Sequence, residues 1–349
     1  MMETIFTKNE FELCDVPVPY GYKQSQTHSG VAICNGKYYL TTSPYPSGSE
    51  AKWKLYLRAA LGKIGLNIRS FIPEQWENPC LYIENRIANE IIPRHFSLMQ
   101  STPLMPPPDP YYGLPAFNSD PDIFIEGDII HVLNRQTYRT KICPGEPLNK
   151  YSNRIYHIYG RIDRGRFYYL GTELLLETNR LVCSPCLTRY DGKYVLMELE
   201  TNTYNEGGNF QGLFITYGDS IEDFKNTRKW QRVEIESDFY LPWHMSVFSF
   251  EGTLYTIIAC VEKGVKQRLW QMLGEFNNDL TSLKVYSTPL TDYNSYRGAA
   301  LVNENKEFVL YNTTVHEKIN GSKSVDGREV ILAHAPFDQV LKRLRENGE

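Results

Sequence analysis

Short apolar runs, rich in Tyr and in β-branched side chains, alternate along the chain with two-residue polar turns. This pattern predicts β-hairpins, and long helical periodicity is nearly absent. One hairpin pattern recurs five times, as HSGVAICNGKYYLTTS, DPDIFIEGDIIHVLNR, SPCLTRYDGKYVLMELE, HMSVFSFEGTLYTIIAC and RGAALVNENKEFVLYN. The copies begin near residues 28, 120, 184, 244 and 297, and the gaps between them hold further strand-like runs such as RIYHIYGRI.

The turns inside these copies have the composition of tight hairpins. Asn35-Gly36 and Asp191-Gly192 are the dipeptides that type I′ turns favour, and Glu126-Gly127 and Glu251-Gly252 are expected to act similarly. Four strands per unit, repeated around a closed ring, are typical of a β-propeller. The sequence therefore predicts an all-β protein, a single five-bladed β-propeller domain over residues 1–349. A β-sandwich or two small β domains is the alternative, but neither explains a polar residue repeated at the same place before every turn.

Two segments depart from the repeat. Residues 93–118 are Pro-rich and are predicted to form a long ordered loop inserted between strands. Residues 336–347 place Phe337, Val340, Leu341 and Leu344 at helical spacing, which predicts a short amphipathic C-terminal helix.

The composition argues against some binding partners and indicates a cellular compartment. A net charge of −4 gives no basic field for a nucleic acid, and no apolar run is long enough for a membrane-spanning helix. The first residues do not resemble a signal peptide, which predicts a protein that is cytoplasmic as synthesised. The seven Cys are scattered through apolar runs, as expected for reduced thiols. The oligomeric state stays open.

The repeat also predicts which residues meet. In a propeller the innermost strands run alongside a central channel, so their first residues share one mouth of it. Positions symmetric about each hairpin turn lie at the same mouth, and counting outward from Asp191-Gly192 places Glu198 and Glu200 beside the residue opposite Ser184. The predicted rim consists of His28, Asp120, Arg135, Ser184, Glu198, Glu200, His244, Arg297 and Asn312.

This set of side chains suits carbohydrate chemistry. Two carboxylates on either side of a glycosidic bond can act as general acid and general base, or as acid and nucleophile. We therefore predict Asp120 with Glu198 or Glu200 as catalytic residues. The expected substrate-binding residues are His28, Arg135, Ser184, His244, Arg297 and Asn312. No cofactor is predicted, although His28, His244 and Asp120 together have the chemistry to hold a cation in the channel.

Three runs resemble a known superfamily. SDPDIFIEGDIIHVLNR and WHMSVFSFEGTLYTI resemble inner strands of the five-bladed propeller glycosidases related to arabinanases, β-xylosidases, invertases and mannoside phosphorylases. WENPCLYIENR, which contains Glu77, resembles a segment of sialidase-like propellers. The resemblance implies that Asp120 is the carboxylate that orients substrate and tunes the pKa of the acid. The sequence departs from the family where catalytic acids are expected, because His28 and Ser184 stand there.

Three classes of function follow from these observations. The first is a glycoside hydrolase-like protein that acts on or binds a carbohydrate at the channel mouth. The second is a non-catalytic glycan-recognition or structural propeller of a phage tail or surface assembly, which would be virion-associated. The third is a scaffold for protein partners that uses the Pro-rich loop.

Overall fold

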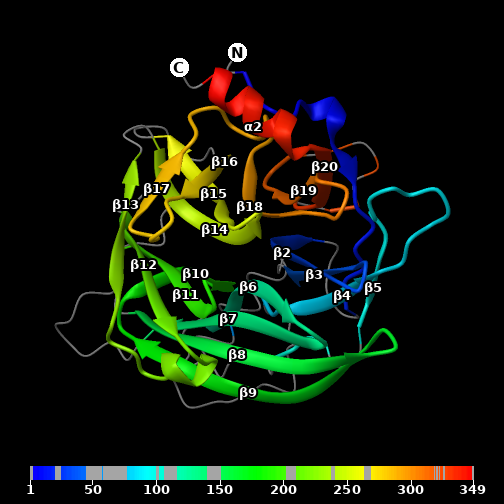
Figure 1. Ribbon diagram of the computed structural model, residues 1–349. Coiled ribbons are helices and arrows are strands. Elements are labelled where there is room, and N and C mark those ends of the chain that lie inside the picture. Colours follow the sequence, from blue (N-terminus) through cyan, green and yellow to red (C-terminus); the bar gives the residue numbers. More distant parts are fainter. Residues whose placement is uncertain are drawn as a thin grey trace.

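The computed structural model describes residues 3–19, 25–44, 57, 77–99, 102–105, 116–139, 151–201, 210–236, 240–262, 269–317, 319, 321, 323–324 and 327–347. These residues form an all-β propeller with one short C-terminal helix, as the sequence predicted (Figure 1). None of the helices in the described part of the chain is long and apolar enough to cross a membrane.

The first two sheets are four-stranded and follow the order of the chain. The first contains β2 (Gln26–Cys34), β3 (Lys37–Pro44), β4 (Cys80–Glu84) and β5 (Phe96–Leu98). The second contains β6 (Ala116–Glu126), β7 (Ile129–Arg139), β8 (Tyr151–Asp163) and β9 (Arg166–Thr178). In both, each strand pairs antiparallel with the next, as in a meander of hairpins.

The third sheet has eight strands, in two antiparallel halves. One half contains β10 (Leu181–Tyr190), β11 (Lys193–Thr201), β12 (Phe210–Gly218) and β13 (Gln231–Glu236). The other contains β14 (Tyr240–Phe250), β15 (Thr253–Glu262), β16 (Leu269–Phe276) and β17 (Ser282–Val285). The outermost strands of the halves, β13 and β17, pair parallel to each other. Dividing the sheet at that contact would give five blades, and the count of five stays a prediction.

The last sheet joins the two ends of the chain. It contains β18 (Ser295–Val302), β19 (Glu307–Thr314), β20 (Val330–Pro336) and, from the N-terminal region, β1 (Glu12–Leu13). The innermost strands β2, β6, β10, β14 and β18 contact one another in that order, and β18 contacts β2 again. The ring of inner strands is therefore closed, and the N-terminal strand holds the last sheet in place.

Apolar side chains fill the spaces between neighbouring sheets. One cluster joins β10–β13 to β14–β17 through residues such as Met197, Leu213 and Met272. The helix α2 (Phe337–Glu346) buries Phe337, Val340 and Leu344 and covers the outside of the β19–β20 region, which confirms the C-terminal helix. Two short 3₁₀ segments, η1 (Lys8–Glu10) and η3 (Ile221–Phe224), lie outside the sheets.

Two local predictions need correction. The loop of the second hairpin is Gly127-Asp128, because Glu126 already pairs with Ile129. The segment 93–118 is not all loop: Phe96–Leu98 forms β5, and β6 already begins at Ala116. A strand of three residues is too short to show a recognisable alternating pattern, and the Pro-rich residues around it favour a loop prediction. Residues 100–101 and 106–115 of that segment lie outside the described residues.

Candidate functional site

Every inner strand carries an irregularity in its pairing at the same level. The register shifts between Thr27 and Gly30 in β2, and the equivalent shifts occur at Ser119/Asp122, Cys183/Cys186, Pro242/His244 and Ser295/Gly298. A β-bulge of this kind inserts an unpaired residue, bends the strand and redirects side chains. The predicted rim residues His28, Asp120, Ser184 and Arg297 lie within these bulges, and His244 borders one.

Three of the bulge residues have an unusual backbone. His28, Asp120 and Ser184 have φ values of 57°, 54° and 48°, in the left-handed region that side chains with a Cβ seldom adopt. Such strain is found mostly where surrounding structure holds it for a function. Proline follows two of these residues, at positions 121 and 185, and it suits an interrupted ladder because it has no N–H to donate.

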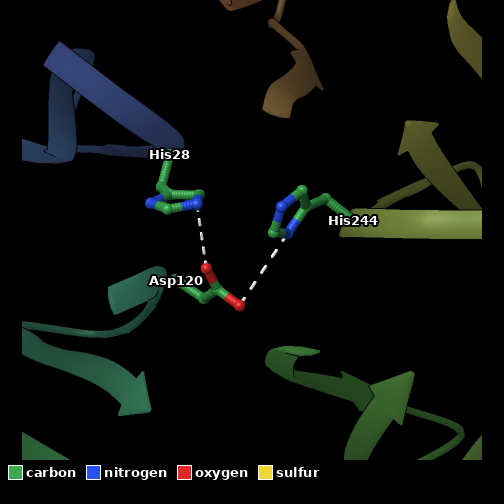
Figure 2. Close-up of side chains that lie close together, drawn as sticks. All are labelled: His28, Asp120 and His244. Carbon is green, nitrogen blue, oxygen red and sulfur yellow. Dashed lines mark ion pairs between the residues drawn. The ribbon is translucent and has the colours of Figure 1, made fainter. Parts of the chain in front are cut away.

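The bulges bring His28, Asp120 and His244 together, and their side chains point toward one another (Figure 2). The Nε2 atom of His28 lies 2.9 Å from Oδ1 of Asp120, and Nδ1 of His244 lies 3.8 Å from Oδ2 of Asp120. The two imidazole ring centres are 5.0 Å apart. All three side chains are almost completely buried.

Neighbouring groups hold this cluster in place. The carboxylate of Asp120 accepts a hydrogen bond from the backbone N–H of Ser184 (2.8 Å) and lies 3.3 Å from the guanidinium of Arg135. The hydroxyl of Ser184 is 2.9 Å from Nδ1 of His244. Tyr296, which is partly exposed, packs its ring beside both imidazoles, with ring centres 4.9 and 4.7 Å away.

The charges in the cluster differ sharply from residue to residue. Burial raises the pKa of Asp120, but the positive charges of Arg135 and His28 outweigh it and hold this pKa well below its usual value. Burial lowers the pKa of His28, but the carboxylates of Asp120 and Glu77 raise it above its usual value. For His244, burial dominates and the pKa falls well below the usual value. The site therefore combines a firmly ionised carboxylate with a neutral imidazole.

His28, Asp120 and His244 could hold a metal ion. Each offers a ligand atom, and the three atoms lie within 4.8 Å of one another. Nε2 of His28 and Oδ1 of Asp120 are buried and face each other at 2.9 Å, and Nε2 of His244 is buried without a hydrogen-bond partner among the described residues. Two ligand atoms at about 2.1 Å from a tetrahedral ion are about 3.4 Å apart, so Nε2 and Oδ1, at 2.9 Å, would move slightly apart to hold one. The residues therefore fit a cation.

A residue that the sequence did not place in the site completes it. Oε1 of Glu77 lies 2.8 Å from Nδ1 of His28, and Thr27 Oγ1 lies 2.6 Å from the same nitrogen. A carboxylate on Nδ1 directs the other nitrogen, Nε2, toward Asp120. The only signal in the sequence was the WENPCLYIENR run, because Glu77 is distant from every hairpin of the repeat.

Arg297 and Asn312 are buried, and the side-chain N–H groups of both donate hydrogen bonds within the protein. Arg297 is fully buried and donates to the backbone carbonyls of Met245 (2.9 Å) and Pro121 (2.5 Å) and to Asp122 (3.1 Å). These acceptors directly follow His244 and Asp120, so the guanidinium ties the strands that carry them. The amide of Asn312 is buried and donates to Ser295. The role of both side chains in substrate binding stays a prediction.

Glu198 and Glu200 also differ from the prediction. The bulge shifts the register, so that Glu198 lies opposite the bulge residues 184–185 and is completely buried, away from the water it was expected to meet. Its Oε1 lies 2.6 Å from the guanidinium of Arg180, which also contacts Glu200 at 2.9 Å. Among the described residues, the charges that act on Glu198 come from Arg180 and Glu200, not from Asp120. The two glutamates form a separate cluster with Arg180.

Comparisons with known proteins agree on the architecture. No protein-family model matches the chain, and no curated protein matches it by sequence. Among solved structures, it is similar to an N-acetylgalactosamine deacetylase from F. plautii in complex with blood group B trisaccharide, with a TM-score of 0.64, 13% identity, and coverage of 95% of this chain and 96% of that one. The chain shares the fold of that deacetylase.

Two glycosidases show the same likeness. A xylan β-1,4-xylosidase from Bacillus halodurans gives a TM-score of 0.56 at 13% identity, over 90% of this chain and 54% of that one. An α-L-arabinofuranosidase from Lactobacillus brevis gives 0.51 at 13% identity, over 88% and 90%. The predicted resemblance to propeller glycosidases is therefore confirmed for the fold.

Proposed function

We propose that the protein is a metal-dependent hydrolase that removes an acyl group from a carbohydrate, with His28, Asp120 and His244 as the metal ligands. The observation that carries this proposal is their convergence at the centre of the inner-strand ring, where each offers one ligand atom and the three atoms lie within 4.8 Å of one another. Two imidazoles and a carboxylate are a common ligand set of hydrolytic metal sites. The likeness to the deacetylase, which extends over nearly the whole of both chains, is consistent with this chemistry.

The surrounding residues would prepare these ligands. Arg135 and the Ser184 N–H keep Asp120 ionised, as a metal ligand must be. Glu77 accepts a hydrogen bond from Nδ1–H of His28 and so leaves the lone pair of Nε2 directed at the site. Ser184 Oγ orients the ring of His244. A divalent cation in such a site supplies Lewis acidity and an activated water molecule.

Hydrolysis of the acyl group breaks its bond to the sugar nitrogen or oxygen. Water adds its hydroxyl to the acyl carbon, and the freed amine or hydroxyl takes the proton. Tyr296, beside both imidazoles and partly exposed, is the described side chain best placed to contact the substrate.

Glycoside hydrolysis is the second candidate, favoured by the likeness to the xylosidase and the arabinofuranosidase. It needs two carboxylates that flank one bond. The pair proposed from the sequence does not supply them, since Glu198 and Glu200 are bound to Arg180. Among the described carboxylates that contact this cluster, glycoside hydrolysis would use Asp120 and Glu77 as the pair, and these two residues lie on either side of His28.

Metal removal followed by product analysis tests the proposal. The protein is stripped with a chelator and titrated with Zn²⁺, Mn²⁺, Co²⁺ or Ca²⁺, and bound metal is measured by elemental analysis. It is then incubated with N-acetylated amino-sugar oligosaccharides and with xylo- and arabino-oligosaccharides. We expect one ion per chain and release of acetate without new reducing ends. New reducing ends without acetate would instead establish the glycosidase, and failure to bind any of the four ions would overturn the metal site.

A further inference from the structure

A cleft of about 410 Å³ lies between β10–β13 and the turn after β16, remote from the channel. Tyr190 ends β10, six residues after Ser184, which at about 3.3 Å per residue places the cleft roughly 20 Å from the site along that strand. Its volume falls within the range of small-molecule sites. The cleft shares no lining residue with the cluster around Asp120.

Two tyrosines provide the aromatic part of the cleft. Tyr217 pairs with Val195, which also pairs with Thr188, so that Tyr217 and Tyr190 lie on the same face of the sheet. The hydroxyl of Tyr190 donates to the backbone carbonyl of Asn278 (3.2 Å), and that of Tyr217 donates to the carbonyl of Asp279 (3.4 Å). Both rings are therefore fixed at their hydroxyl ends before any ligand arrives.

The polar part of the lining contains both donors and acceptors. Lys193 brings an ammonium, Gln231 and Asn278 bring amides, and Asp191 and Asp279 bring carboxylates. Two acids and one base leave a slightly negative lining, which disfavours phosphate or another anion. A neutral sugar ring suits this lining, since its hydroxyls both donate and accept hydrogen bonds and its C–H face packs on an aromatic ring.

We propose that this cleft, which we call the Tyr190–Tyr217 cleft, is a second carbohydrate-binding site for a neutral glycan. It holds a glycan at the end of the propeller opposite the channel bulges and takes no part in bond cleavage. The proposal depends on the proposed function only in taking a carbohydrate as the ligand, and it requires neither the metal nor the hydrolysis.

Substitution of Tyr217 tests the cleft. Binding of xylohexaose and of hexa-N-acetylchitohexaose is measured by isothermal titration for the wild type, Tyr217→Ala and Tyr169→Ala. Tyr169 is a matched control, because it is an exposed tyrosine on β9 (52% exposed, against 37% for Tyr217) and does not line the cleft. We expect Tyr217→Ala to weaken binding of at least one oligosaccharide by about 10-fold or more, and Tyr169→Ala to leave it unchanged.

The outcomes separate this proposal from the proposed function. Equal binding by Tyr217→Ala and the wild type, with acetate release intact, overturns the cleft alone. Selective loss of binding in Tyr217→Ala, in a protein that releases no acetate, supports the cleft and overturns the deacylation. If neither oligosaccharide binds the wild type, the cleft proposal is wrong. Equal weakening by Tyr169→Ala would also contradict it, because the effect would not be local.

Discussion

Two acidic clusters in the described part of the chain behave in opposite ways. At the channel centre, Asp120 accepts a backbone hydrogen bond and lies near Arg135 and two imidazoles, and its pKa stays well below the usual value. Beside β11, Glu198 is equally buried and faces one guanidinium that it shares with Glu200. Burial dominates there and raises the pKa of Glu198 to about 7.

The difference shows that burial alone does not make a carboxylate a metal-binding residue. Several positive or hydrogen-bonding groups around one carboxylate keep it charged, which a metal ligand requires. A single cation divided between two carboxylates does not offset the cost of removing one of them from water. The first arrangement suits binding of a cation, and the second suits a pH-dependent structural contact.

Asp120→Asn is expected to have the largest effect on this comparison. The amide keeps the shape of the side chain but loses the charge. Loss of a residue that only hydrogen-bonds a metal ligand costs up to about 100-fold in affinity. Loss of the ligand charge itself should therefore lower the affinity for a divalent ion by more than about 100-fold. Acetate release should fall with it. Bound metal and turnover are measured on the same samples.

The matched control is Glu200→Gln, which also neutralises a carboxylate paired with an arginine. It should leave metal affinity within about two-fold of the wild type, because the Arg180 cluster makes no described contact with the three ligands. Equal metal affinity in Asp120→Asn and Glu200→Gln would remove the distinction between the two clusters.

Glu198→Gln should change the pH dependence of stability and not the affinity for metal. Between pH 4.5 and about 7 the folded chain keeps a proton on Glu198 that the unfolded chain has released. The unfolding free energy of the wild type therefore falls as pH rises through this window, by up to about 3 kcal/mol from this group. Glu198→Gln lacks that decline. The unfolding free energy of Glu198→Gln minus that of the wild type should therefore be larger at pH 8 than at pH 4.

Urea unfolding at several pH values measures this effect. The quantity of interest is the change, with pH, in the difference between wild type and Glu198→Gln, since other titrating groups cancel in it. A difference that stays constant from pH 4 to pH 8 would mean that Glu198 has the same pKa in the folded and in the unfolded protein. The two buried acids would then not differ as described.

The hairpin repeat explains how much of this could be predicted from the sequence. Period-two patterns and turn dipeptides such as Asp191-Gly192 depend on local chemistry, so the all-β propeller and the convergence of His28, Asp120 and His244 were predictable. The side of β11 on which Glu198 lies was not. Each bulge adds residues that counting outward from a turn does not include. A shift of one residue then changes which side chain faces the channel.

Glu77 was missed for a different physical reason. It belongs to no hairpin copy, and it reaches His28 from the segment before β4 only through the tertiary structure, which periodicity does not encode. Arg297 was predicted at the correct position along its strand, but its side chain donates to several acceptors within the protein, which only the structure reveals.

Glu77→Gln is the finest test of the channel cluster. Gln keeps the size of the side chain but offers a weaker acceptor to Nδ1 of His28, so Nε2 is less firmly held as the free nitrogen. Loss of such a partner costs about 10- to 100-fold in metal affinity. We expect a loss within that range, smaller than for Asp120→Asn, with the metal stoichiometry still one per chain. A loss equal to that of Asp120→Asn would make Glu77 a ligand in its own right, and no loss would leave Thr27 as the group that orients His28.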